Sequence, residues 1–507
     1  MVDTKREIER KYEAGAGTGP SNLSDLPDLT RVRGVSAVVD RGVVELDATY
    51  YDTADQRLAA ASLTLRRRTG GHDAGWHLKL PVSDGVRDEI HAPLSDTVPP
   101  ALTGLVRSRT RDAELVPVVR LRSARDVRHL VDGSGGLLAE ISLDRVRAER
   151  LSGGDGTTEW TEIEVELADG SDPAILDKVE KKLRKAGVSR SASSSKLARA
   201  LSETGRRPRK EAVVAAAPVT AGDHVLAYVR AQRDAIVALD PAVRRDVHDA
   251  VHSMRVATRR LRSTFRSYGA VLDRTVTDPV RDELKWLAGE LGADRDREVL
   301  TERLTAALDG LPPALLSGPV HDRLRTWAQA RRSGSRHRLV AVLDGGRYLD
   351  LLTTLDALLV TPPLRSAAAD TTGKTLTKAV RKDFAQLSGL VAEAVALESG
   401  ETRDLAIHEA RKKAKRTRYA AELAAPVLGE PAKELVRDMK ALQSLLGEHQ
   451  DSVMARQALR DLADQAHVAT ESAFTYGVLY GREEQRAATA EAALPEAWES
   501  IQGESAF

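Results

Sequence analysis

Residues 7–11 read Glu-Ile-Glu-Arg-Lys, and this stretch decides how the N-terminal half of the chain is interpreted. Side chains alternate between the two faces of a β-strand, so Glu7, Glu9 and Lys11 share one face. A face with two carboxylates and an ammonium group does not suit an apolar core. Such a polar inward face is typical of a closed barrel that is wide enough to hold a ligand.

Short stretches with the same alternation recur outward from this one, at residues 43–46, 63–68, 76–80, 140–143 and 162–167. Turns that contain glycine or aspartate separate them. Within these stretches Arg66 and Arg68 share one face, and Glu162 and Glu164 share another. The pattern predicts that residues 1–202 form a β-rich domain with antiparallel strands.

The charged faces indicate a chemistry as well as a fold. Carboxylates that gather without cysteine suit a hard divalent cation, Mg²⁺ or Mn²⁺. Arginine and lysine beside them suit phosphate oxygens. Together they predict metal-assisted chemistry on a polyanion. The alternative is that the strands lie at a surface, where opposite charges form ordinary cross-strand ion pairs.

Five motifs follow one another in this half: Glu7-x-Glu9-x-Lys11, Leu65-Arg66-Arg67-Arg68, Leu78-Lys79, Glu162-Ile163-Glu164 and Ser195-Lys196. This ordered set resembles the CYTH family of triphosphate tunnel metalloenzymes. The resemblance implies an eight-stranded antiparallel tunnel. One wall would bind Mg²⁺ or Mn²⁺ through acidic residues, and the other would bind a triphosphate through basic residues.

The resemblance also implies roles for individual residues. The metal would be bound by Glu7, Glu9, Asp144, Glu162 and Glu164. The triphosphate would be contacted by Lys11, Arg66, Arg68, Lys79, Lys196 and one of Arg120 and Arg122. Catalysis would depend on Glu7, Glu9 and Lys11: one cation would neutralise phosphate oxygens, a second would activate water, and Lys11 would orient that water or relay a proton. Glu89 and Glu140 are weaker candidates on further strands.

The chain changes character after a predicted linker at residues 203–222. Residues 223–507 have helical spacing, and prolines or glycines interrupt it, which predicts an all-α domain. The stretch from His252 to Arg262 recurs from His408 to Arg418. Two further marks, Leu291-Gly292 and Leu446-Gly447, recur at nearly the same spacing. We therefore expect a duplicated helical unit with repeats at about 223–360 and 374–500.

Each repeat carries a basic stripe along one face of a helix. The stripes consist of His252, Arg255, Arg259 and Arg262 in the first repeat, and His408, Arg411, Lys415 and Arg418 in the second. Duplicated stripes predict a surface that binds a polyanion. The alternative is a solvated charged face. Aromatic residues make up 4% of the chain, which disfavours single-stranded nucleic acid, because its bases stack on aromatic side chains.

These stripes, together with Leu291-Gly292-x-x-x-Asp296 and its second copy, resemble the CHAD domain over residues 220–505. That resemblance implies a duplicated antiparallel helical bundle whose basic groove binds inorganic polyphosphate through the eight stripe residues. A competing motif, His248-Asp249-x-x-His252, has the spacing of a helical zinc site. It lacks an evident third ligand.

Composition excludes several other classes of protein. The chain of 507 residues has 76 basic and 75 acidic side chains and no cysteine, so disulfide scaffolds, thiolate metal sites and thiol nucleophiles are excluded. The sequence has no long uncharged apolar run, and its first residues are charged. We therefore expect a cytoplasmic protein without a membrane partner. Association with polyphosphate granules is compatible with this expectation.

The combined expectation is an α+β multidomain protein with an eight-stranded antiparallel tunnel followed by an all-α duplicated bundle. Its expected function is that of a metal-dependent triphosphatase, which splits inorganic triphosphate into diphosphate and phosphate and binds polyphosphate through its helical domain. Two alternatives stay open. The tunnel acts on thiamine triphosphate or ATP, or the protein binds polyphosphate without catalysis. The sequence leaves the oligomeric state open.

Overall fold

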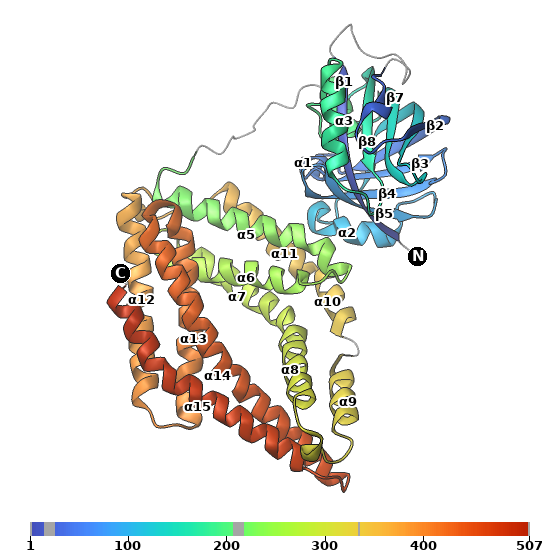
Figure 1. The fold of residues 1–507 in the computed structure, drawn as a ribbon. Coiled ribbons are helices and arrows are strands. Elements are labelled where there is room, and N and C mark those ends of the chain that lie inside the picture. Colours follow the sequence, from blue (N-terminus) through green and yellow to red (C-terminus); the bar gives the residue numbers. More distant parts are fainter. Residues whose placement is uncertain (1–2, 15–25, 206–216, 333–334, 505–506) are drawn as a thin grey trace. The chain divides into compact units, whose positions relative to one another are not determined.

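The computed structural model describes residues 3–14, 26–205, 217–332, 335–504 and 507. The chain divides into two compact units, Met1–Val214 and Ala215–Phe507 (Figure 1). The predicted linker at 203–222 lies mostly outside the described residues. Of its described parts, residues 203–204 end one helix and residues 221–222 begin another.

The N-terminal unit is built on a single antiparallel sheet. Its strands are β1 (Asp3–Ala14), β2 (Ala37–Asp52), β3 (Thr64–Thr69), β4 (Gly75–Ser83), β5 (Val86–Ala92), β6 (Val116–Val131), β7 (Leu137–Arg150), β8 (Thr157–Leu167) and β9 (Val188–Arg190). The order is β5-β4-β3-β2-β6-β7-β8-β1-β9. The first half of β1 pairs with β5 and its second half with β8, so β1–β8 close into a barrel. The expected eight-stranded antiparallel barrel is confirmed.

Apolar side chains of the barrel point mainly outward, where short helices cover them. The helices of this unit are α1 (Arg57–Ala60), α2 (Pro100–Thr110), α3 (Ala174–Lys185), α4 (Lys196–Thr204) and the 3₁₀ turn η2 (Leu29–Arg31). Helix α3 lies along the outside of the barrel (Figure 1), over a buried cluster that includes Ile141, Ile163 and Val179. Helix α2 covers a second cluster around Trp76 and Leu78. Because these cores lie outside the barrel wall, the interior is free to be polar.

Helix α4 closes one end of the barrel. Its Leu197 and Ala200 are buried in a cluster with Tyr50, Leu121 and Trp160, which are side chains of the barrel strands. Ser195 caps the helix, since its side chain accepts a hydrogen bond from the backbone N–H of Ala198. The interior is therefore apolar and filled beyond the first turn of α4.

The C-terminal unit is all-helical. Its α-helices are α5 (Ala221–Arg244), α6 (Ala250–Ser267), α7 (Arg274–Glu290), α8 (Gly292–Asp309), α9 (Val320–Arg332), α10 (Ser335–Asp344), α11 (Gly346–Val360), α12 (Thr372–Ala396), α13 (Glu401–Leu428), α14 (Glu430–Val468) and α15 (Phe474–Glu504). Two 3₁₀ turns, η3 (Pro313–Leu315) and η4 (Ser366–Ala368), connect some of them. Across the described part of the chain, no helix combines the length and apolar character that a membrane span requires.

The same order of packed helices occurs twice in this unit. Helix α6 packs between α5 and α7, and α13 packs between α12 and α14. The two copies meet where α6 contacts α13. A buried ion pair supports this junction: Lys413 Nζ lies 2.7 Å from Asp383, which also accepts a hydrogen bond from Ser267 of α6. Lys413 is therefore tied to an acidic partner in the bundle.

Candidate functional site

The barrel interior forms a cavity of about 800 Å³ with a largely charged lining. Most of the predicted site residues of the N-terminal unit line it, namely Glu7, Glu9, Lys11, Arg66, Arg68, Lys79, Glu164 and Lys196. Strand alternation explains this grouping, because each of these strand residues belongs to the inward-facing set of its strand. The cavity ends at Ser195 and Lys196, where α4 begins.

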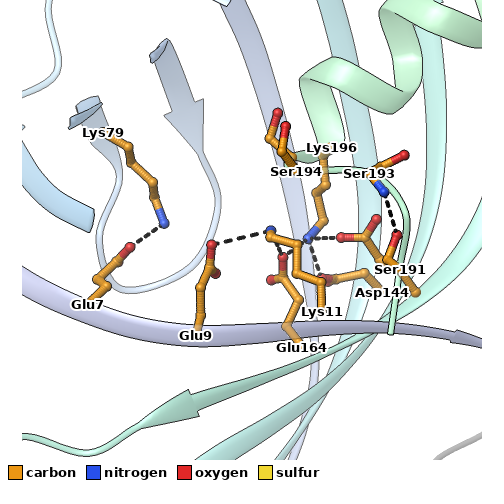
Figure 2. Close-up of polar contacts among 12 residues, drawn as sticks. Glu7, Glu9, Lys11, Lys79, Asp144, Glu164, Ser191, Ser193, Ser194 and Lys196 are labelled. Carbon is orange, nitrogen blue, oxygen red and sulfur yellow. Dashed lines mark hydrogen bonds and ion pairs between the residues drawn. The ribbon is translucent and has the colours of Figure 1, made fainter. Parts of the chain in front are cut away.

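Three buried carboxylates form an acidic cluster at that end of the cavity. Asp144, Glu162 and Glu164 each offer one oxygen, and these oxygens lie within 4.8 Å of one another. The ammonium group of Lys196 lies 2.9 Å, 2.6 Å and 2.7 Å from the three, respectively. Figure 2 shows Lys196 reaching down to Asp144 and Glu164. The three carboxylates thus converge on one point where positive charge is already present.

Arg125 of β6 is a second cation that contacts this acidic cluster, and it was not among the residues predicted from the sequence. Its guanidinium lies 2.7 Å from Asp144 and 2.5 Å from Glu164. Burial alone would raise the pKa of Glu164, but Lys11, Lys196 and Arg125 outweigh burial and hold that pKa well below its ordinary value. Glu164 therefore stays ionised, as a carboxylate ligand of a cation must be.

The structure corrects the prediction for β6. Neither Arg120 nor Arg122 lines the cavity; Arg120 Nε instead lies 2.9 Å from Asp47, and Arg122 lies 3.6 Å from the same side chain. Arg125 is an odd number of residues from both, so strand alternation places it on the opposite, inward face. Strand alternation would have predicted Arg125 as the inward-facing arginine if the inward face of β6 had been known from the sequence.

Glu7 belongs to a second acidic group, nearer to β4 and β5. Lys79 Nζ lies 2.5 Å from Glu7 and 3.6 Å from Glu89, and His77 Nδ1 lies 3.1 Å from Glu89. Burial raises the pKa of Glu7 to about 7, although Lys79 opposes this shift. Burial would also raise the pKa of Glu89, but Lys79 and the His77 hydrogen bond hold it well below its ordinary value. Glu89 is thus an ionised member of the site.

Glu9 and Lys11 lie between these two acidic groups on the same strand (Figure 2). Lys11 forms an ion pair with Glu164 and lies 3.5 Å from Glu9. Arg87 lies 3.8 Å from Glu9 and donates a hydrogen bond of 2.6 Å to the carbonyl of Ser194, just before α4. Strand β1 therefore carries one continuous charged face from the β4–β5 side to the acidic cluster.

The basic side of the cavity is formed mainly by β3. Arg66 donates a hydrogen bond of 3.3 Å to the Tyr50 hydroxyl and lies 3.5 Å from Glu89. Arg68 forms an ion pair with Asp73. Burial, followed by repulsion from Arg66, lowers the pKa of Arg68 to about 9. An anion bound beside Arg66 and Arg68 would relieve this repulsion.

The C-terminal unit contains a separate basic groove between α6 and α13, with a volume of about 720 Å³. All eight predicted stripe residues line it: His252, Arg255, Arg259, Arg262, His408, Arg411, Lys415 and Arg418. The repeated glycines explain part of this placement. A Cβ atom on Gly292 would lie 2.9 Å from the guanidinium of Arg255, and one on Gly447 would lie 3.4 Å from that of Arg411. These glycines leave room for the groove arginines.

Several cations of the groove have no ion-pair partner among the described side chains. Among the described side chains, Arg259, Arg411 and Lys415 form no ion pair with a carboxylate. Burial, followed by repulsion from the neighbouring arginines, lowers the pKa of Lys415 to about 7. Arg418 differs, because Glu422 lies 3.2 Å away. The groove thus has the electrostatics of an anion-binding site.

The zinc alternative receives no support from the described part of the chain. The clusters of potential metal ligands found there include neither His248 nor His252. One such cluster in the helical unit joins Asp404, His449 and Glu491, but Arg456 and Arg403 already pair with its two carboxylates. This second cluster is balanced as an ion-pair network.

Comparison with known proteins identifies both halves. A CYTH domain model matches residues 5–201, and a CHAD domain model matches residues 227–460. The chain is 36% identical to "Uncharacterized protein MT2285" of Mycobacterium tuberculosis over 496 residues, which cover 94% of this chain and 92% of that protein.

Two solved structures resemble the chain over 55% of its length. PptA from Streptomyces chartreusis is 22% identical, with a TM-score of 0.47, and 99% of it is covered. The CHAD domain from the plant Ricinus communis is 25% identical, with a TM-score of 0.43, and 92% of it is covered. From the matches of both domain models in this order, the chain belongs to the proteins in which a CYTH domain is fused to a C-terminal CHAD domain.

Proposed function

We propose that this protein is a metal-dependent inorganic triphosphatase whose CHAD domain binds polyphosphate. The observation that carries the proposal is the barrel cavity, which is lined by several cations and by Glu164, the member of the buried acidic cluster that reaches it. The CYTH family contains phosphoanhydride hydrolases, and their substrates are polyanions that need both kinds of group.

The acidic cluster fits Mg²⁺ or Mn²⁺. Asp144, Glu162 and Glu164 supply carboxylate oxygens, which these cations prefer, and Glu9 would extend the set across the cavity. The convergence of all three carboxylates on the Lys196 ammonium supports a cationic centre at this point. When bound, the metal would neutralise phosphate charge and acidify a water molecule.

The protein's own cations would bind and orient the triphosphate. Arg66, Arg68 and Lys79 would hold phosphate oxygens from the β3–β4 side. Lys196 and Arg125, which pair with the acidic cluster, would exchange some of these contacts for hydrogen bonds to the phosphate oxygens of the substrate. Lys11, between Glu9 and Glu164, would hold a proton near the attacked phosphate. Positioning and charge stabilisation of this kind supply most of the rate in phosphoryl transfer.

The closed end of the barrel favours a short substrate. Because α4 and its apolar cluster fill the interior beyond Lys196, a long polyphosphate could insert only its end. Tyr50 is the single tyrosine, tryptophan or phenylalanine that lines the cavity, so the described lining offers little aromatic surface for a base or thiazolium ring. The closed end thus disfavours long polyphosphate as a substrate, and the sparse aromatic lining favours inorganic triphosphate over ATP and thiamine triphosphate.

Phosphate release from four substrates tests this proposal. The purified protein should hydrolyse triphosphate fastest in the presence of Mg²⁺ or Mn²⁺, slowly attack thiamine triphosphate, ATP and long-chain polyphosphate, and lose activity in EDTA. Preference for ATP or thiamine triphosphate would replace the substrate assignment. No turnover of any substrate, with polyphosphate still bound, would make this a binding protein.

Polyphosphate binding should weaken as the pH rises, because of Lys415. A bound polyanion raises the pKa of Lys415 above its free value of about 7, so binding takes up a proton when the pH exceeds 7. The contribution of the Lys415 charge to polyphosphate affinity is complete below pH 7 and is lost as the pH rises above 7. We expect about a tenfold fall in affinity between pH 6 and pH 8 from this group, by fluorescence titration. Lys415→Arg, which keeps both groove histidines, should show a flatter profile; identical profiles would contradict the assignment.

A further inference from the structure

A second cavity of about 720 Å³ continues the groove on one side. The two cavities share lining residues, namely Arg259, Arg262, Lys285, Lys412, Lys415 and Tyr419. Beyond these shared residues the second cavity, here called the side chamber, extends to Arg266, Arg281 and Arg416. Groove and side chamber therefore form one continuous basic channel.

The two repeats differ at positions that line this extension. Arg266 of α6 corresponds to Glu422 of α13, and Lys412 corresponds to Val256. At the Glu422 side the carboxylate accepts a hydrogen bond of 3.0 Å from Arg260 and lies 3.2 Å from Arg418. Arg260 and Arg418 on that side are thus already paired with a carboxylate of the protein itself. The groove is pseudo-symmetric at its centre, and among the described residues the Arg266 side continues it with further cations.

Three cations of the side chamber are available to a ligand, whereas Arg281 and Arg416 are held in internal ion pairs. Arg266, Lys285 and Lys412 are all exposed. Arg266 and Lys285 form no ion pair with a carboxylate within the described ranges. Lys412 pairs with Glu409 one helical turn away, and an exposed pair of this kind contributes little. An incoming polyanion therefore gains these contacts without breaking a strong internal interaction.

We infer that a polyphosphate chain longer than the groove leaves it on one side only, over the side chamber, where it contacts Arg266, Lys285 and Lys412. This inference rests on the proposed polyphosphate-binding function of the CHAD domain. Polyphosphate repeats the same charge along a flexible chain, so each further cation along its path adds affinity. On the opposite side, Glu422 is a carboxylate at the position of Arg266, so the described residues there offer a less favourable path.

The repeat supplies a matched pair of variants for the test. Lys285 and its counterpart Lys440 are both exposed lysines, but Lys440 lines neither the groove nor the side chamber. In the full chain, Lys285→Ala should weaken long-chain polyphosphate binding severalfold, whereas Lys440→Ala should leave it unchanged. Arg266→Ala with Lys412→Ala should weaken binding about tenfold and lower the salt slope by about one to two. All substituted side chains are exposed, so folding should be preserved.

The outcomes separate this inference from the proposed function. If Lys285→Ala and Lys440→Ala behave alike, or if Arg266→Ala with Lys412→Ala binds as the wild type does, the one-sided path is wrong. If Arg255→Ala with Arg411→Ala also retains full affinity, polyphosphate binding in the groove is itself wrong. Any polyphosphate bound by the barrel contributes equally to all these variants and cancels in the comparison.

Discussion

Replacing Glu164 by glutamine should lower kcat for triphosphate hydrolysis by about 100- to 1000-fold, while triphosphate binds at least as tightly as before. Glu164 lies in the acidic cluster and contacts Lys11, Lys196 and Arg125. Glutamine removes one negative charge from this cluster and leaves the three cations in place. The metal should therefore bind more weakly, whereas the attraction for the anionic substrate should increase.

A matched control lies on the same strand. Glu159 is an exposed residue of β8 in the outward-facing set, so Glu159→Gln removes the same charge from the opposite face. That variant should hydrolyse triphosphate at the wild-type rate, and Glu7→Gln should lose activity as Glu164→Gln does. Turnover and equilibrium binding of triphosphate should be measured separately across a range of Mg²⁺ concentrations. Unchanged kcat in Glu164→Gln would remove the acidic cluster from the mechanism.

The double substitution Arg255→Ala with Arg411→Ala should weaken binding of long-chain polyphosphate by about 100-fold. These repeat-related arginines line the groove, and Gly292 and Gly447 hold open the space that they occupy. Each lost charged contact should also lower the slope of log affinity against log salt concentration by about one, by analogy with other dense polyanions. Hydrolysis of triphosphate should be unaffected.

A variant with the same charge change controls for long-range electrostatics. Lys433 and Arg437 are exposed on α14 and line neither the groove nor the side chamber. Lys433→Ala with Arg437→Ala should therefore keep the wild-type affinity and salt slope. Thermal unfolding of both double variants would check that the helical unit remains folded. Equal losses in the two would show that net charge, not the groove, sets the affinity.

Several features could be predicted from the sequence because they depend on local periodicity. Strand alternation placed Glu7, Glu9 and Lys11 on one face, and helical spacing placed four cations of each stripe on one side of a helix. Both periods are fixed by backbone geometry over a few residues. The order of the motifs then identified both domains, and the fold of each agrees with that expectation.

Other features required the closed sheet. Period-two alternation tells which residues of β6 share a face, but not which face points inward, so Arg125 was missed and Arg120 and Arg122 were chosen. Helices α2 and α3 determine which face points outward, because their apolar side chains bury that face of the sheet although they lie far away in the sequence.

The sequence by itself determined the residue types, their faces and the duplication. Only the tertiary structure decided which charges meet: that Lys196 joins the acidic cluster, that Glu89 joins Glu7, and that Glu422 neutralises one side of the groove. The physical reason is that electrostatic energy depends on distances of a few ångströms between residues that can be more than a hundred positions apart in the chain. Such distances are set when the barrel closes and the two helical repeats pack together.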